Sequence, residues 1–146
     1  MTEIGFYHLT RSSLEQALPR LLGRVLALPA RALVLCPDAE RLRALDAALW
    51  TCPEPDWLPH GTTDGPDQPI FLTGIDAPPP NGARHLFLVN GAESAHLELY
   101  DRGFDLFDGT DDAAVEAARR RWKAVKAAGH APAYWQQGPK GWERKA

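Results

Sequence analysis

The sequence predicts a single α/β domain over residues 1–146, in which a mostly parallel, mixed β-sheet is flanked by helices. Its 146 residues suit one core that buries roughly 70% of the surface of the unfolded chain. The unbroken apolar run from Ala32 to Cys36 is typical of a strand covered on both faces. A Pro-Asp turn then leads into a helix at Ala39, and a strand followed at once by a helix is the unit from which parallel sheets are built.

The N-terminal segment predicts a strand and then a helix. Ile4 to Leu9 form the expected opening strand, with aromatic residues at interior positions. Ser12 and Glu15 have the spacing of a capping box, which starts the helix there. Pro19 either kinks this helix or marks where its main part begins. The apolar face of the helix comprises Leu14, Ala17, Leu18, Leu21, Leu22, Val25 and Leu26.

A second helix is expected from Ala39 to Leu49, because Asp38 is a good N-terminal cap. Its apolar spacing predicts that Trp50 packs on the core as well. The leucines expected on the same buried face are Leu42, Leu45 and Leu49. The prolines between Pro53 and Pro69 then predict a long connection.

Beyond this connection, Ile70 to Thr73 and Leu86 to Val89 predict two further strands. A proline-rich turn that ends at Gly82 separates them. Leu97 to Phe107 mixes apolar and acidic residues around Gly103, which we interpret as the end of a helix followed by an outer strand.

The last helix has the strongest pattern. Thr110 is the expected N-cap and Gly129 suits the position after the C-terminus. The expected inward stripe consists of Val115, Ala118, Trp122 and Val125, and the neighbouring basic strip of Arg119, Lys123 and Lys126. We expect residues 136–146 to form a flexible tail.

The charge is distributed unevenly. The net charge is −3, but residues 119–146 carry eight basic residues and one acidic one, while the preceding residues carry eight and eighteen. These two parts therefore stand at about +7 and −10 by formal charge. Such a chain repels an anionic partner over most of its surface and accepts it at one end.

The composition is that of an ordinary globular protein, with 45% hydrophobic and 24% charged residues. No apolar stretch approaches the ~20 residues of a membrane span, and the first residues do not resemble a signal peptide. Cys36 and Cys52 fit neither a redox pair nor a zinc site. We therefore expect a reduced, cytoplasmic protein without membrane contact.

Motifs for catalysis are missing. The turn after Cys36 lacks G-x-G-x-x-G, so the expected fold is Rossmann-like without a nucleotide-binding motif. Neither a phosphate-binding P-loop nor a G-x-S-x-G nucleophile is present, and the histidines are isolated in sequence, so we expect no cofactor and no metal. His60 beside Asp56 or Asp64 would suit a general base, but such a loop histidine more often bonds a backbone carbonyl. We expect no catalytic residue.

Three interpretations of the basic end remain open at this point. Its cations would neutralise phosphates while Trp122 stacks on a base. Alternatively, an arginine would grip a carboxylate of an acidic peptide while Trp122 forms the wall of an apolar pocket. The third interpretation is a helix whose charged face is simply solvated.

An ordered set of motifs resembles one family. The chain resembles the chi subunit of bacterial DNA polymerase III holoenzyme, an accessory protein of the clamp-loader assembly. The motifs are Phe6-Tyr-His-Leu9, the Ala-Leu-Pro-Arg-Leu-Leu run from Ala17, Ala48-Leu-Trp50, Trp57-Leu-Pro-His-Gly61, Gln68-Pro-Ile70, Pro80-Asn-Gly82, Arg121-Trp-Lys-Ala-Val-Lys-Ala-Ala through Gly129, and Tyr134-Trp-Gln-Gln137. Together they span nearly the whole chain.

The resemblance implies a subunit without enzymatic activity of its own that bridges two partners in DNA replication. The psi subunit would contact Trp50, Trp57, Pro59 and His60. Of the two tryptophans, we expect Trp57 to be the exposed anchor and Trp50 mainly a packing residue. The protein would join the replisome at the nucleoid, with DNA contacted mainly indirectly.

The second implied partner is the acidic C-terminal tail of the single-stranded-DNA-binding protein. Arg119 would grip the terminal carboxylate of the tail, Trp122 and Lys123 would form the pocket for its last side chain, and Lys126 would support them. Val115 and Asp108 replace a basic and an apolar residue of the family pattern, so the outer rim of this site differs. The alternative function is a module that binds single-stranded nucleic acid directly.

Overall fold

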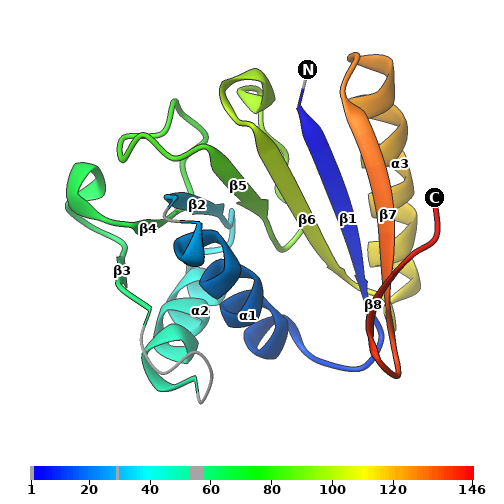
Figure 1. Cartoon of the computed structure of the whole chain (residues 1–146), viewed down its shortest axis with the longest axis horizontal. Helices are drawn as coiled ribbons and strands as arrows, with labels where there is room; N and C mark the ends of the chain where they lie inside the picture. The colour runs from blue at the N-terminus through cyan, green and yellow to red at the C-terminus, as the bar shows by residue number, and fades with distance from the viewer. Residues whose placement is uncertain (1, 29, 53–57) are drawn as a thin grey trace.

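An eight-stranded sheet forms the centre of the protein (Figure 1). The computed structural model describes residues 2–28, 30–52 and 58–146. The strand order is β3-β4-β2-β5-β6-β1-β7-β8, and the pairing is parallel everywhere except between β7 and β8. The strands are β1 (Glu3–Leu9), β2 (Ala32–Leu35), β3 (His60–Gly61), β4 (Ile70–Thr73), β5 (His85–Leu88), β6 (Arg102–Asp108), β7 (Ala131–Gly138) and β8 (Gly141–Arg144). The predicted α/β class with a mostly parallel, mixed sheet is confirmed.

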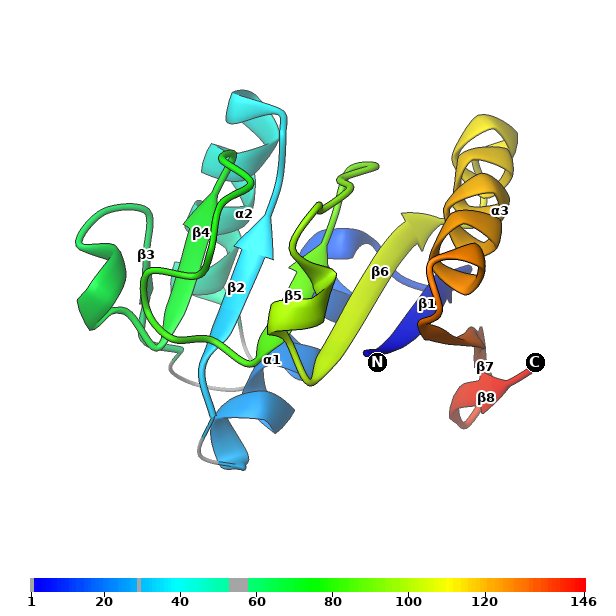
Figure 2. The ribbon, with the colours of Figure 1, turned by 90° about the horizontal axis from the view of Figure 1, so that it is seen from above.

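Helices cover both faces of the sheet. They are α1 (Leu14–Ala27), α2 (Ala39–Thr51) and α3 (Asp112–Ala127), with short 3₁₀ turns η1 (Gly65–Asp67) and η2 (Leu97–Leu99). The β1-α1-β2 crossover runs toward β3, whereas the β6-α3-β7 crossover runs toward β8. Since both are expected to be right-handed, α1 and α3 lie on opposite faces. Figure 2 shows α3 beside β6 and β1, and α2 at the other end of the sheet beside β4 and β2.

The core has a layer on each face of β1. Tyr7 and Leu9 belong to the cluster beneath α1 and α2, while Ile4 and Phe6 belong to the cluster beneath α3. This alternation follows from the two-residue period of a strand. The opening strand therefore supplies the floor on which α3 rests.

Several predicted boundaries are confirmed and others are wrong. Asp38 caps α2, since its carboxylate accepts hydrogen bonds from two backbone amides of the first turn. At α1, however, Ser13 and not Ser12 is the N-cap, and Gln16 accepts the bond from its amide at 2.9 Å. Pro19 lies inside α1, which runs through it.

At α3 the N-cap is Asp111 rather than Thr110, because the Asp111 carboxylate accepts bonds from the amides of Ala113 and Ala114. Thr110 instead donates its hydroxyl to Asp108 at 2.6 Å. Gly129 follows the end of α3 with a φ of +90°, as the sequence predicts.

The C-terminal half of the sheet differs most from expectation. The strand expected at an outer position is β6, which lies in the middle of the sheet between β5 and β1. Most of the expected flexible tail, residues 136–146, lies in the β7–β8 hairpin. The polar Gln137 ties this hairpin to the chain before α1, because its amide oxygen accepts bonds from the backbone amides of residues 10–12.

Asn81 joins three segments of the chain through its buried side chain. Its Nδ2 donates to the carbonyls of Ala32 at 3.1 Å and Gln68 at 2.9 Å, and its Oδ1 accepts from the amide of Ala83 at 3.2 Å. We predict that Asn81→Ala lowers the free energy of unfolding by about 2 kcal/mol, because buried backbone groups lose their partners. Urea denaturation measures this effect. The exposed Thr62→Ala serves as the control, and equal stability of the two variants would contradict the structural role.

Candidate functional site

A buried ion pair fixes α3 to the sheet. Arg121 Nε donates to Asp105 Oδ2 at 2.6 Å and its Nη2 to Oδ1 at 2.9 Å, a two-pronged arrangement within the protein. Burial raises the pKa of the Asp105 carboxyl, and the hydrogen bonds and charge of Arg121 oppose that rise. Because Asp105 lies on β6, the pair sets the position of α3 along its own axis.

Aromatic rings form the floor next to this anchor. The Trp122 ring lies 5.5 Å from that of Phe6 on β1 and 6.3 Å from that of Tyr134 on β7. The Tyr134 hydroxyl is hydrogen-bonded to His8 Nδ1, which holds the phenol in place. Burial raises the pKa of Tyr134, and the nearby Arg119 opposes the rise. The floor is therefore rigid and apolar, and its phenol is neutral.

A hollow of about 570 Å³ lies above these rings. Phe6, Phe107, Trp122 and Tyr134 supply its apolar surface. Its charged lining residues are Arg119, Arg120, Lys123 and Glu116, which leave a net positive rim. We call this feature the α3 pocket. An apolar floor under a cationic rim suits a ligand that is anionic and carries an apolar group.

The structure brings three of the four predicted tail-binding residues together. Arg119, Trp122 and Lys123 line the α3 pocket, whereas Lys126 lies one turn further along the helix and does not line it. Arg119 faces Glu116 at 3.3 Å, but both side chains are exposed, so this pair is weak and leaves the guanidinium available.

The two rim positions that depart from the family pattern behave differently. Val115 lines the α3 pocket, so a basic group is missing from its edge. Asp108 lies outside the pocket, and its carboxylate accepts two bonds from Thr110. These bonds hold the pKa of Asp108 below its ordinary value. Asp108 therefore serves the turn before α3.

Sequence reasoning missed part of this pocket. Arg120 adds a cation to the rim, although its place on the helix does not distinguish it from a solvated residue. Phe6, Phe107 and Tyr134 come from three different strands, and only the strand order β6-β1-β7 brings them together. The aromatic residues of the opening strand were the one feature of the sequence that could have indicated an aromatic floor.

A second group of candidate residues lies at the opposite end of the sheet, around the end of α2 and β3. Trp50 is 64% exposed, which contradicts its expected packing on the core. It is the last but one residue of α2 and lies beside, not on, the helix face that buries Leu45 and Leu49. Its ring rests against that of His60 at 4.7 Å. Pro59 is half-buried, and Trp57 lies outside the described residues. Trp50 is thus itself an exposed aromatic surface.

His60 has a structural role. Its Nδ1 lies 2.6 Å from the carbonyl oxygen of Leu58, and its Nε2 lies 3.2 Å from both the carbonyl and the carboxylate oxygen of Asp46. The ring is buried, so it supports Trp50 from below. The acid beside it is Asp46 of α2 and not Asp64, while Asp56 lies outside the described residues. The expected bond to a backbone carbonyl is confirmed.

Comparison with known proteins identifies the family. The family described as DNA polymerase III chi subunit, HolC, matches residues 1–133. The chain belongs to this chi subunit family. It is also similar to the probable DNA polymerase III subunit chi of Rickettsia prowazekii (strain Madrid E), with 25% identity over 100 residues. That alignment covers 66% of this chain and 60% of the length of the Rickettsia protein.

The chi family match includes both groups of candidate residues, from Trp50 to Lys126, and ends just before Tyr134. Within the part of the chain that the structure describes, no three His, Cys, Asp or Glu side chains gather as a metal site would require. None of the described helices combines the length and apolar character needed to span a membrane.

Proposed function

We propose that this chi-family protein is a non-catalytic accessory subunit of the DNA polymerase III clamp-loader assembly. It bridges the psi subunit to the acidic C-terminal tail of the single-stranded-DNA-binding protein during DNA replication. The observation that carries the proposal is the α3 pocket, where a cationic rim surrounds an aromatic floor. The family match supports a place in the polymerase assembly.

The α3 pocket suits the end of an acidic peptide. Arg119 presents a planar guanidinium that pairs with a terminal carboxylate through two bonds. The last apolar side chain of the tail packs against Trp122 over the floor. Lys123 and Arg120 face acidic residues further along the tail, and Lys126 extends the positive strip by one turn. The α3 pocket thus recognises both the negative charge of the tail peptide and its C-terminal residue.

The psi subunit binds at the opposite end of the sheet, on Trp50 and the loop through Trp57 and Pro59 to His60. An exposed tryptophan on a supporting ring is a typical interface anchor. His60 contributes by holding Trp50 in place. Since this surface and the α3 pocket lie at opposite ends of the sheet (Figure 1), one protein can bind both partners at once.

The mechanism is tethering. A subunit held by the clamp loader on one side and by coated template on the other raises the effective concentration of the two. No residue of the chain needs to change protonation or form a covalent bond. DNA is then reached mainly through the protein that coats it. Titration of the purified chain with a labelled tail peptide, in parent and Arg119→Ala forms, tests this proposal.

We predict that Trp50→Ala weakens binding of the psi subunit about tenfold or more, because it removes an exposed aromatic anchor. The free energy of unfolding should change little, since the side chain is mostly in solvent. Biolayer interferometry with immobilised psi subunit measures the affinity. Ile75→Ala is the matched control, because Ile75 is a large apolar residue that is also exposed. Equal affinity of Trp50→Ala and Ile75→Ala would contradict the assigned surface.

A further inference from the structure

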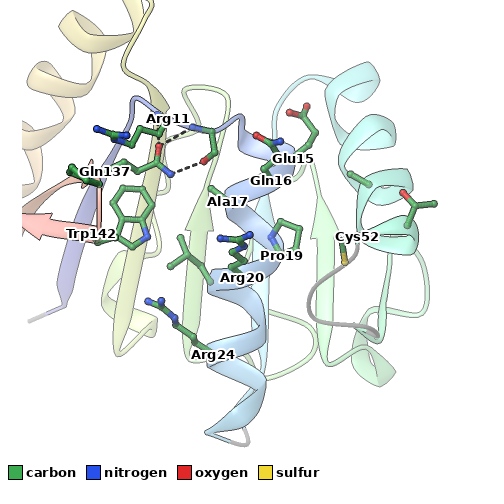
Figure 3. A pocket seen from close by; sticks show the side chains of 17 residues that line it. Arg11, Glu15, Gln16, Ala17, Pro19, Arg20, Arg24, Cys52, Gln137 and Trp142 are labelled. Carbon is green, nitrogen blue, oxygen red and sulfur yellow. Dashed lines mark hydrogen bonds between the residues drawn. The ribbon is translucent and has the colours of Figure 1, made fainter.

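A second hollow lies on the face of the sheet opposite the α3 pocket (Figure 3). Its volume is about 690 Å³, and its walls are α1, the end of α2 and the β7–β8 hairpin. We call it the hairpin groove. Its lining includes none of the described residues that are assigned to the two partners of the proposed function.

Three arginines give the hairpin groove its charge. Arg11, Arg20 and Arg24 line it. Figure 3 shows Arg20 and Arg24 following one another along α1, and Arg11 beside Gln137 in the chain before this helix. None of the three guanidiniums forms an ion pair or a hydrogen bond with the residues that the structure describes. The acid in the lining is Glu15, which pairs with Arg41 at 3.0 Å. The groove is therefore a row of uncompensated positive charges in a chain with a net charge of −3.

An aromatic ring faces the arginines from the hairpin. Trp142 is half-buried and lines the groove beside Arg20 and Arg24 (Figure 3). The ring of Tyr7 meets it edge-on at 5.0 Å and an interplanar angle of 88°, which fixes its orientation. One edge of the indole is thus held by the core while the side chain remains accessible from the groove.

The hairpin wall of the groove is fastened to the chain that leads into α1. Besides the backbone bonds that its side chain accepts, Gln137 donates from its amide nitrogen Nε2 to the Ser12 hydroxyl at 2.6 Å. Thr10 donates its hydroxyl to the carbonyl of Gln137 at 3.1 Å. These bonds, drawn in part in Figure 3, hold the hairpin beside the start of α1. The groove is preformed, so a ligand does not have to order it.

We propose that the hairpin groove binds a short stretch of single-stranded nucleic acid, with Arg11, Arg20 and Arg24 on successive phosphates and Trp142 against a base. Arg20 and Arg24 are four residues apart, about 6 Å along α1, so they present two positive charges on the same side of the helix. A positive groove with an aromatic stacking surface is the usual arrangement for binding single strands. The α3 pocket offers a floor of four aromatic rings to an apolar side chain, whereas the described lining of the hairpin groove offers a single ring, Trp142, beside three arginines. One stacking surface beside several cations suits a base between phosphates, which favours nucleic acid.

The test is a fluorescence anisotropy titration of the full chain with a labelled 16-nucleotide oligothymidylate at several salt concentrations. Arg20→Ala/Arg24→Ala should weaken binding about tenfold or more, because two phosphate contacts are lost. Three phosphate contacts predict that the logarithm of the association constant falls with the logarithm of the salt concentration with a slope of about −2. In the double variant, which keeps one contact, the slope should be about −0.7. Trp142→Ala should cost about fivefold or more, and Trp142→Phe should restore part of the loss.

Matched controls separate this site from the α3 pocket. Arg43→Ala removes one exposed arginine of α2 outside the groove and should leave oligonucleotide binding unchanged. Arg119→Ala should weaken binding of the tail peptide but not of the oligonucleotide, so the two proposals fail independently. Loss of oligonucleotide binding in Arg119→Ala, or equal binding by the double variant and the parent, would overturn the inference. Tighter binding of polyglutamate than of the oligonucleotide at the same arginines would also overturn it.

Discussion

Arg119→Ala and Trp122→Ala should each weaken binding of the acidic tail peptide by about 2 kcal/mol or more, which is roughly thirtyfold. Arg119→Ala removes the group assigned to the terminal carboxylate, and Trp122→Ala removes the surface assigned to the last apolar side chain. Fluorescence anisotropy with a labelled peptide measures both losses. Affinity should also fall with added salt, because charges at an exposed pocket are screened.

The controls for these variants follow from the structure. Arg43→Ala removes an exposed arginine at a distance from α3 and should bind the peptide like the parent. Trp122→Phe retains a ring against Phe6 and should recover part of the affinity. Thermal unfolding of Trp122→Ala shows whether the floor persists without the indole. Unchanged affinity in both alanine variants would refute the assignment of the α3 pocket.

Arg121→Met should lower the free energy of unfolding by about 3–5 kcal/mol, since it leaves the buried Asp105 carboxylate without its partner. Chemical denaturation measures this loss. The double variant Asp105→Leu/Arg121→Met should recover most of it, because replacing both charges with apolar groups removes the buried charge. A single variant as stable as the parent would show that the pair does not anchor α3.

The pH dependence of Arg121→Met has a definite sign. Without Arg121, burial and the negative charge of Glu93 both act on Asp105 and raise its pKa further above the unfolded value. The folded state then binds the proton more tightly than the unfolded state. Stability of the variant should therefore fall as pH rises from about 4, and its deficit relative to the parent should shrink in acid. A constant deficit between acidic and neutral pH would contradict this account.

The elements that could be predicted from the sequence are those whose amino-acid composition matches their burial. β2 and β4 were predicted because they are short apolar runs, and α2 because Asp38 caps it. The position of β6 was predicted wrongly because its composition does not match its burial. Its buried Asp105 makes the strand look partly exposed, and only the ion pair with Arg121 on a later helix allows it in the middle of the sheet.

Long-range contacts explain the other differences. Gln136 and Gln137 suggest a polar tail, but Gln137 bonds to residues 10–12, more than 120 positions earlier. Trp50 was expected in the core because it adjoins a helical apolar pattern, yet Leu45 and Leu49 form the buried face of α2 and Trp50 lies outside it. In the same way, helical spacing identified Arg119, Trp122 and Lys123, while the aromatic floor required the strand order.

The bridging function requires that one molecule binds both partners at the same time. Mass photometry of an equimolar mixture of this chain, the psi subunit and the single-stranded-DNA-binding protein tests the bridge most directly. We predict a complex that contains all three proteins, and its loss when the acidic tail of the binding protein is deleted or Arg119 is replaced by alanine. Formation of the same complex without the tail, or only pairs of proteins with the tail intact, would contradict the bridging function.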